Sequence, residues 1–342
     1  MKQYLARACL ALSLAFIGGC GGGGGGSEPT PVVTPFLVIT TVNGLPVPAL
    51  GIKYSITMES GDKIEVKASP NGAQWTVTAD GNVIQADANQ DGSSFSAVLN
   101  SPKGGQVVIK AVSSNDPSQE VEITAVVNAQ KYERAAAQVG EVRTWTETDT
   151  HKDGSIVVVK NEVSTAAVHG DGSYDQSVRD ITTSPGTVTE TRLLDSEDNL
   201  LERTIANNNR CTYDPVRKLL KFPLYYGKSP WTSQWHYSCQ QGFEETVDSI
   251  TTVADYEPVT VGGTTHDALR LHTHVIVTQS NDPRLPLGSG GQAGYDQSID
   301  CWWSVSLKRN VKCVTTTTYP SLLGQEAPGS YSHILVQELT GP

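Results

Sequence analysis

The feature that most constrains the fold of this chain is an alternation of apolar and polar residues with a period of two. The pattern is clear at residues 63–68 and returns at residues 120–127. It is the pattern of half-buried antiparallel strands, because successive side chains of a strand point to opposite faces. Turn sequences such as Asp80-Gly81 and Asp91-Gly92 separate further short apolar runs. The sequence therefore predicts an all-β protein.

The chain has 342 residues, which is long enough for two domains. In residues 36–128, short strands are expected at 75–78, 95–99 and 107–112 as well as in the two alternating runs, and together they predict a small β-sandwich. With Trp75 at a core aromatic position but no cysteine pair, this segment resembles bacterial immunoglobulin-like repeats. The resemblance implies an immunoglobulin-like fold and nothing about activity.

Residues 129–138 contain only a short helix-favouring stretch and are expected to be a linker. From residue 139 to residue 342 the strand patterns resume, which predicts an antiparallel domain built as a large curved sheet or an open barrel. The expected strands are 139–150, 155–165, 173–182, 187–195, 199–207, 234–239, 244–256, 268–278, 299–306, 311–319 and 331–339.

The first twenty residues have the order of an export signal. Lys2 and Arg7 precede residues 8–17, which are apolar except for Ser13. Ten residues rise ~15 Å as a helix, about half of the ~30 Å hydrocarbon core, so a transmembrane anchor is not expected. Residues 1–19 are therefore expected to be a signal peptide.

An Ile-Gly-Gly-Cys motif ends this segment at Cys20. It resembles the processing box of bacterial lipoproteins, which implies that Cys20 becomes the mature N-terminus and carries acyl chains such as palmitate. Two or more chains anchor a protein stably. Gly21, which is not an aspartate, implies sorting to the outer membrane in a Gram-negative host. Residues 20–35, with six consecutive glycines and then several prolines, are expected to be a tether.

The charge of the chain argues against nucleic acid as a partner. Lysines and arginines number 25 against 36 aspartates and glutamates, and no run of five basic residues occurs. Loss of Lys2 and Arg7 with the signal peptide lowers the net charge from −11 to −13. Because anionic headgroups repel an acidic protein, the N-terminal lipid is expected to be the membrane contact.

Four cysteines follow Cys20 in the chain, an even number that indicates disulfides on an exported protein. Cys301 and Cys313 lie symmetrically about the middle of the run between them, so a hairpin there would set them close to opposite each other. We pair Cys301 with Cys313 and Cys211 with Cys239. Four cysteines allow three pairings, and this one needs only local closure. A zinc site is not expected because close Cys-x-x-Cys pairs are absent.

Motifs for catalysis, metals or cofactors are weak. His272 and His274 would share a strand face, as two metal ligands can, but the other face of residues 268–278 is the apolar one, so both are expected to face solvent. The run that starts at Asp87 opens like a calcium loop, but its twelfth position is Val98 instead of an acid. No Gly-x-Ser-x-Gly motif occurs. We expect no enzyme activity, no metal and no cofactor.

Tryptophans are the candidate ligand contacts. Trp231 and Trp235 could share one strand face, whereas Trp302 and Trp303 must point to opposite faces. Exposed aromatic rings would suit a sugar or a lipid tail. The alternative is that these four side chains close the core of a large sheet.

Several short motifs follow one another within residues 211–320. They are Phe-Pro-Leu at 222–224, Gly-Lys-Ser at 227–229 with Trp231, Ala-Leu-Arg at 268–270, and a tryptophan hairpin at 301–312. In this order they resemble a family of uncharacterised exported bacterial proteins, although Pro230 and Arg309-Asn310 depart from its pattern. The resemblance implies curved sheets similar in shape to periplasmic lipoprotein carriers, with no established catalysis.

Together these features predict an outer-membrane-anchored lipoprotein with a non-enzymatic binding or structural role. Its partners would be the membrane, through the N-terminal lipid, and a lipid, glycan or protein ligand. The alternative is a carrier of a lipid or another apolar ligand in the second domain. An apolar hollow of ~300 Å³ or more would support the carrier, and a filled interior would support the structural role.

Overall fold

The computed structural model describes residues 36–47, 53–151, 153–183, 185–205, 208–281, 293–318 and 332–341. The expected signal peptide, Cys20 and the tether therefore lie outside the described residues. The described residues form strands β1 to β21 and no α-helix, which confirms the all-β prediction. None of them belongs to a helix long and apolar enough to cross a membrane.

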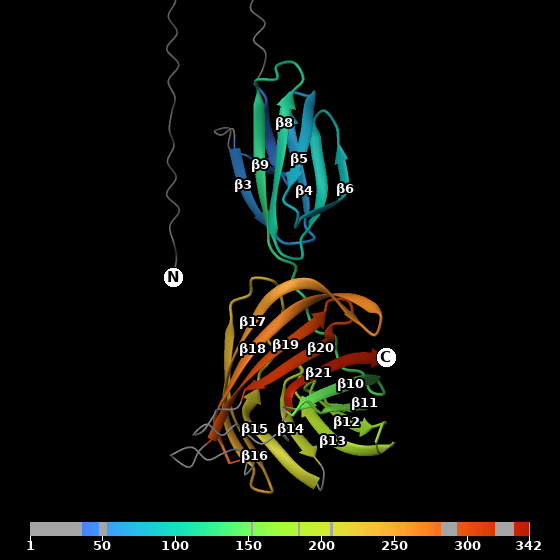
Figure 1. Cartoon of the computed structure of the whole chain (residues 1–342). Coiled ribbons are helices and arrows are strands. Elements are labelled where there is room, and N and C mark those ends of the chain that lie inside the picture. Colours follow the sequence, from blue (N-terminus) through green and yellow to red (C-terminus); the bar gives the residue numbers. More distant parts are fainter. Residues whose placement is uncertain are drawn as a thin grey trace, which may run out of the picture. The chain divides into compact units, whose positions relative to one another are not determined.

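Strands β1 to β9 build two sheets that share one core (Figure 1). One sheet has the order β2-β1-β4-β7-β6, and the other has the order β3-β9-β8-β5 with β3 and β9 parallel. The strands are β1 (Val38–Val42), β2 (Leu45–Pro46), β3 (Lys53–Met58), β4 (Lys63–Ser69), β5 (Ala73–Ala79), β6 (Ile84–Gln90), β7 (Ser94–Asn100), β8 (Gly105–Ser113) and β9 (Glu120–Val127).

The core of this sandwich is made by the apolar side chains of the alternating runs. Ile64 and Val66 of β4 are fully buried and pack in one cluster with Ile109 of β8 and Ile123 of β9. Trp75 also lies in this core, and its Nε1 donates a hydrogen bond to the backbone oxygen of Asp91 (2.8 Å). The two sheets therefore pack face to face over a filled interior.

The remaining strands form a closed antiparallel barrel in sequence order (Figure 1). They are β10 (Val142–His151), β11 (Ile156–Val168), β12 (Tyr174–Asp180), β13 (Thr187–Leu194), β14 (Leu200–Ile205), β15 (Asn209–Arg217), β16 (Trp231–Cys239), β17 (Glu244–Val261), β18 (Thr264–Ser280), β19 (Ala293–Ser304), β20 (Arg309–Thr318) and β21 (Ser332–Gly341).

Pairing of β21 with β10 closes the barrel. Glu147 of β10 lies opposite Gln337 of β21, and Thr148 lies opposite Val336. The sequence predicts strands with a curved or open arrangement, and the structure adds this last seam. Each described barrel strand thus has a paired neighbour on both sides, although β17 extends beyond β16 from Thr252 to Val261 and pairs there with β18.

Two barrel features follow directly from local sequence. The long hairpin of β17 and β18 turns at Gly262-Gly263, where both residues have positive φ (56° and 82°), as a type I′ turn requires. The two disulfides, Cys211–Cys239 and Cys301–Cys313, each join residues directly opposite each other on neighbouring strands. Both bonds thus reinforce hairpin pairing already present in the sheet.

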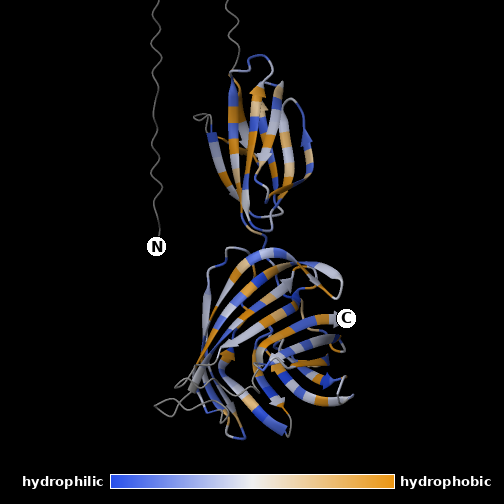
Figure 2. Cartoon of the chain, in the orientation of Figure 1, coloured by the Kyte–Doolittle hydropathy of each residue, from blue (hydrophilic) through white to orange (hydrophobic). Residues whose placement is uncertain are grey.

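The segment between β15 and β16 folds into the barrel. Leu224 of this segment is fully buried and packs in a cluster with Leu269 of β18 and Trp303 of β19. Tyr132, from the expected linker, pairs with Leu224 through two backbone hydrogen bonds (2.8 and 2.9 Å). A second cluster, around Trp235 and Tyr237 of β16, occupies another part of the interior. Apolar and polar residues alternate along the strands, as expected for a sheet with an inner and an outer face (Figure 2).

Candidate functional site

Three adjoining hollows lie within the barrel. The first has a volume of about 230 Å³, the second about 370 Å³ and the third about 290 Å³. Gln337 of β21 lines all three. Arg192 and Asp198 line the first and third, and Arg203 and Arg217 line the second and third. Because neighbouring hollows share walls, we treat them as one space, the lumen.

The lumen is built from alternate residues of the strands, as expected for one face of a sheet. Arg143, Trp145 and Glu147 of β10 line it, and so do alternate residues of β12 such as Tyr174 and Gln176. Strands far apart in the sequence contribute to the same wall, since β10, β12, β13 and β20 all line the first hollow. Closure of the sheet is therefore what assembles the site.

The lining combines aliphatic side chains, such as Val247, Val275 and Val277, with many charged, amide and aromatic ones. It includes the arginines Arg143, Arg192, Arg203, Arg217 and Arg309, the acids Glu147, Glu190, Glu245 and Asp198, the amides Gln176, Asn199, Gln297, Asn310 and Gln337, and the aromatic residues Trp145, Tyr174, Tyr213, Trp235, Tyr237, Tyr295 and Trp303.

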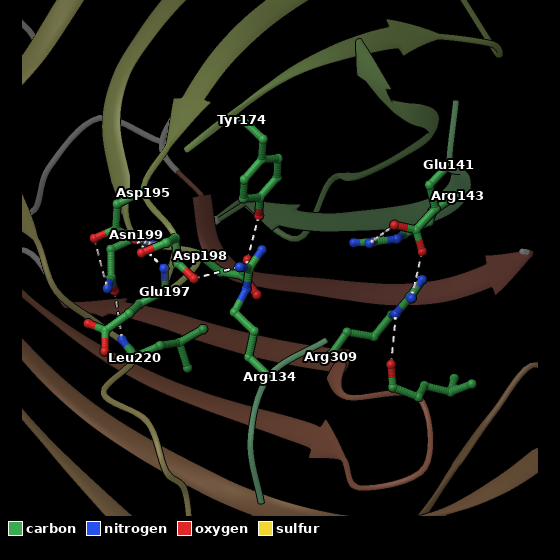
Figure 3. Close-up of polar contacts among 12 residues, drawn as sticks. Arg134, Glu141, Arg143, Tyr174, Asp195, Glu197, Asp198, Asn199, Leu220 and Arg309 are labelled. Carbon is green, nitrogen blue, oxygen red and sulfur yellow. Dashed lines mark hydrogen bonds and ion pairs between the residues drawn. The ribbon is translucent and has the colours of Figure 1, made fainter. Parts of the chain in front are cut away.

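One wall of the lumen is held by an arginine from the linker (Figure 3). Arg134 Nε donates to Asp198 Oδ1 (2.7 Å), and Tyr174 Oη donates to the same oxygen (2.6 Å). The guanidinium carbon of Arg134 also lies 5.2 Å from the centre of the Tyr174 ring. Burial and the Asp198 carboxylate raise the pKa of Tyr174. The phenol therefore stays neutral and acts as a donor.

Asp198 is positioned by the tight turn between β13 and β14. Asp195 Oδ1 accepts hydrogen bonds from the backbone nitrogens of Glu197 and Asn199, both at 2.8 Å. Asn199 Oδ1 in turn accepts from the backbone nitrogen of Leu220 (3.0 Å) (Figure 3). The aspartate at the start of the turn and the asparagine at its end are typical turn residues. They tie the turn to the segment that folds into the barrel.

A second carboxylate neutralises two lumen arginines. Glu141 accepts a hydrogen bond from Arg143 (2.6 Å) and forms an ion pair with Arg309 (2.6 Å) (Figure 3). Burial raises the pKa of Glu141, but the hydrogen bonds and charges of the two arginines outweigh it and hold the pKa below its ordinary value. Arg143 and Arg309 thus have their own counter-charge.

Two further lumen acids are also engaged. Glu190 of β13 receives two parallel hydrogen bonds from Arg192, from Nε and from Nη2, both at 2.9 Å. Glu147 accepts from Gln337 Nε2 across the closing seam (2.9 Å). The Glu190–Arg192 pair fixes its side chains most firmly, because a two-point contact restricts orientation as well as distance.

Arg203 and Arg217 differ from the other lumen arginines. Within the described residues, no carboxylate lies at ion-pair distance from either of them, although both line the second and third hollows. Arg203 Nε donates to Tyr237 Oη (2.8 Å), and its guanidinium lies 5.0 Å from the centre of that ring. Arg217 lies 5.7 Å from the Trp235 ring, and its buried Nε has no hydrogen-bond partner in the described part of the chain.

The structure separates the four candidate tryptophans. Trp235 lines the second hollow and Trp303 lines the first. Trp231 is buried in the apolar cluster around Leu224. Trp302 points to the opposite face of the sheet from Trp303, where its Nε1 donates to Glu257 (2.9 Å). Of the four, only Trp235 and Trp303 line the hollows described above.

The histidine and aspartate motifs have local partners. His272 contacts Asp300 (Nδ1 to Oδ1, 3.1 Å), and His274 is exposed on the same strand. Asp91 Oδ1 accepts from the backbone nitrogens of Ser93 and Ser94, both at 2.7 Å, which makes it a turn residue. In the described ranges, no three His, Cys, Asp or Glu side chains are grouped so that they could hold a metal ion.

Sequence reasoning missed the arginines of the lumen. A signal for them exists in β13, where Glu190, Arg192 and Leu194 occupy every second position and so share one strand face. Charged residues in phase with an apolar one indicate an interior that is not filled by packing alone. Arg203 and Arg217 carry no such local signal, because β14 has no clear alternation of apolar and polar residues and the alternation of β15 ends before Arg217, at Asp214-Pro215.

No family model and no curated protein matches the chain. Among solved structures, it is similar to the hypothetical lipoprotein YmcC from Escherichia coli (K12), with 12% sequence identity and a TM-score of 0.32. The match covers 60% of this chain and 91% of that chain. A likeness this distant carries no argument about function.

Proposed function

We propose that this protein is a lipid-anchored protein of the bacterial outer membrane whose barrel binds a polar ligand in its lumen, without catalysing a reaction on it. The observation that carries the proposal is the lumen itself. It is hollow, and charged, amide and aromatic side chains from strands all around the barrel converge on it. Binding sites combine a concave surface with such convergent polar groups.

The contrast with the sandwich supports binding over a purely structural role. The sandwich interior is filled by aliphatic side chains such as Ile64, Leu99 and Ile109. The barrel interior instead holds ion pairs such as Glu190–Arg192 next to open space. Buried ion pairs contribute little net stability, and apolar side chains of the same volume would often be equally stable there. A requirement of stability alone does not account for this lining.

The same lining favours a polar ligand over a lipid tail. An alkyl chain in the second or third hollow would lie against Arg203 and Arg217 and would remove their water without replacing its hydrogen bonds. A ligand with hydroxyl, amide or anionic groups would replace them. Trp235 and Tyr237 offer apolar surface for the body of such a ligand.

The state of the lumen carboxylates favours binding over catalysis. The lumen carboxylates described above are engaged, with Glu190 held by Arg192, Glu147 by Gln337 and Asp198 by Arg134. Among the described residues, the cysteine that lines it, Cys313, is bonded to Cys301. These contacts favour a fixed, pre-organised binding surface over groups that exchange protons with a substrate.

The anchor and the location are proposed from the motif that ends at Cys20. Its acyl chains would hold the protein at the membrane, and Gly21 favours the outer membrane. Residues 20–35 would separate the lipid from the folded domains.

Native mass spectrometry of the exported full chain, with Cys20→Ser to remove the lipid, tests the function. We expect an adduct of small-molecule mass that is lost on mild unfolding. Gln337→Leu, which changes a side chain lining all three hollows, should lower the adduct fraction. Gln240→Leu is the matched control, because Gln240 is an exposed turn residue and the adduct should persist. Bare protein in all three samples would contradict a binding function and favour a structural one.

A further inference from the structure

Arg203 and Arg217 line the same part of the barrel wall. They lie on the neighbouring strands β14 and β15, which pair with each other, and both line the second and third hollows. Each guanidinium lies over an aromatic ring of β16, Arg203 over Tyr237 and Arg217 over Trp235. The rings support the planar faces of the two groups, so the N–H edges are the part left for other contacts.

Among the described residues, no carboxylate lies at ion-pair distance from Arg203 or Arg217. The charges of Arg192, Arg203 and Arg217 all lower the pKa of the Glu190 carboxylate. Both oxygens of Glu190 are already bonded to Arg192. Glu190 therefore forms an ion pair with Arg192, whereas Arg203 and Arg217 form no ion pair with a described residue.

Glu245 also lines the second hollow, and it does not neutralise the pair directly. Its carboxylate accepts hydrogen bonds from Tyr295 Oη and Ser280 Oγ, both at 3.0 Å. The second hollow thus has arginine donors at Arg203 and Arg217, while the Glu245 carboxylate is engaged with other side chains. A ligand that fills it needs an acceptor group for the two arginines.

Partly desolvated guanidinium groups without counter-ions are costly unless a ligand supplies the charge. Arg217 Nε is buried without a hydrogen-bond partner in the described part of the chain, and Arg203 uses only Nε, toward Tyr237. We infer that Arg203 and Arg217 form an oxyanion subsite, which binds a carboxylate, phosphate or sulfate group of the ligand through their N–H edges. Such contacts are strong because the donor is charged and the fork matches two oxygens.

This inference rests on the proposed function and specifies it. The ligand class becomes an anionic molecule, with the anion at the arginine pair and the rest of the molecule in the second hollow. A carboxylate and a phosphate share the chemistry that the pair recognises, so the test must separate them.

The experiment uses the full chain with Cys20→Ser and measures the midpoint of thermal unfolding against ligand concentration at constant ionic strength. The probes are inorganic phosphate, inorganic sulfate, glucuronate and neutral glucose. We expect an oxyanion to raise the midpoint in a saturable way, with glucose far weaker than glucuronate. Stabilisation by glucuronate but not phosphate would assign the carboxylate as the preferred anion, and the reverse result would assign phosphate.

Two variants and a control make the test specific. Arg203→Gln and Arg217→Gln remove one charge each and should weaken the apparent affinity about tenfold or more. The matched control is Arg210→Gln on β15, whose side chain is 55% exposed and pairs with Glu202, so it should bind as the parent does. If all four proteins respond equally to the anions, the stabilisation is non-specific and the inference is wrong.

The failure of this inference can be told apart from the failure of the proposed function. The double variant Arg203→Gln/Arg217→Gln is analysed by native mass spectrometry beside the parent protein. An adduct that persists in it at parental occupancy would show that the lumen binds a ligand without the oxyanion subsite. Loss of the adduct in the double variant alone is the result the inference predicts. Should that variant fail to fold, Arg203→Lys and Arg217→Lys keep the charge and are expected to weaken binding by a smaller factor.

Discussion

At the scale of single residues, the lumen is organised by which acid neutralises which base. Glu141 pairs with Arg143 and Arg309. Asp198 pairs with Arg134, and Glu190 pairs with Arg192. The side chain of Glu190 is 15% exposed. Burial raises its pKa, but the hydrogen bond and charge of Arg192, with the charges of Arg203 and Arg217, hold that pKa below the ordinary value of 4.5. This group should therefore make stability depend on pH.

Glu190→Gln tests this charge balance. A carboxyl whose pKa is lowered by folding stabilises the protein fully above its unfolded pKa, and this contribution is lost as pH falls through the folded pKa. We expect the variant to be less stable than the parent by about 2 kcal/mol near neutral pH, and the difference to shrink as pH falls below about 4.5. Urea unfolding at a series of pH values measures it.

Glu244→Gln is the control for this series, because Glu244 is exposed at the start of β17. It should remain close to the parent at every pH, within about 0.5 kcal/mol. A difference between Glu190→Gln and the parent that stays constant down to about pH 3 would contradict the assigned role of the carboxylate.

At the scale of elements, the segment between β15 and β16 is the part of the barrel that is not a strand and yet reaches its interior. Leu224 is fully buried there, and the segment is held to the linker at Tyr132 and to the turn of Asn199 through Leu220. It belongs to the apolar cluster of Leu269 and Trp303. This cluster bounds the first hollow through Leu220 and Trp303.

Leu224→Ala tests whether the segment is a structural part of the barrel. Removal of a fully buried leucine side chain leaves a cavity, and we expect a loss of about 2–5 kcal/mol in the free energy of unfolding. Leu307→Ala in the turn between β19 and β20 is the control, since that side chain is 38% exposed and should cost about 0.5 kcal/mol or less. Equal effects of the two changes in denaturant unfolding would show that the segment is not packed as described.

The strands themselves were largely predictable from the sequence. The expected run 187–195 corresponds to β13 (Thr187–Leu194), and 311–319 corresponds to β20 (Arg309–Thr318). β15 (Asn209–Arg217) of the barrel was not predicted, and neither were β1, β2, β3 and β6 of the sandwich. The sequence of β15 contains Asp214-Pro215, and its pairing with β16 ends at Asp214, just before the residue that has no N–H to donate. Turn-favouring residues inside a strand hide its pattern.

At the scale of the whole molecule, closure of the barrel is the feature that local sequence patterns do not predict. The seam pairs β10 with β21, elements almost two hundred residues apart, and no local pattern fixes such a contact. The lumen depends on that seam, since Glu147 and Gln337 meet across it and Gln337 lines all three hollows. Sequence reasoning could therefore propose tryptophans as ligand contacts but could not place the arginines beside them.

The central claim is that the lumen is a binding site for a polar ligand. A crystal structure of the protein purified from its own host, without added ligand-like buffer anions, tests it most directly. We predict electron density larger than a water molecule in the second or third hollow, with an oxygen-bearing group at the N–H edges of Arg203 and Arg217. Hollows that hold only ordered water, in a protein with the barrel closed as described, would contradict the claim.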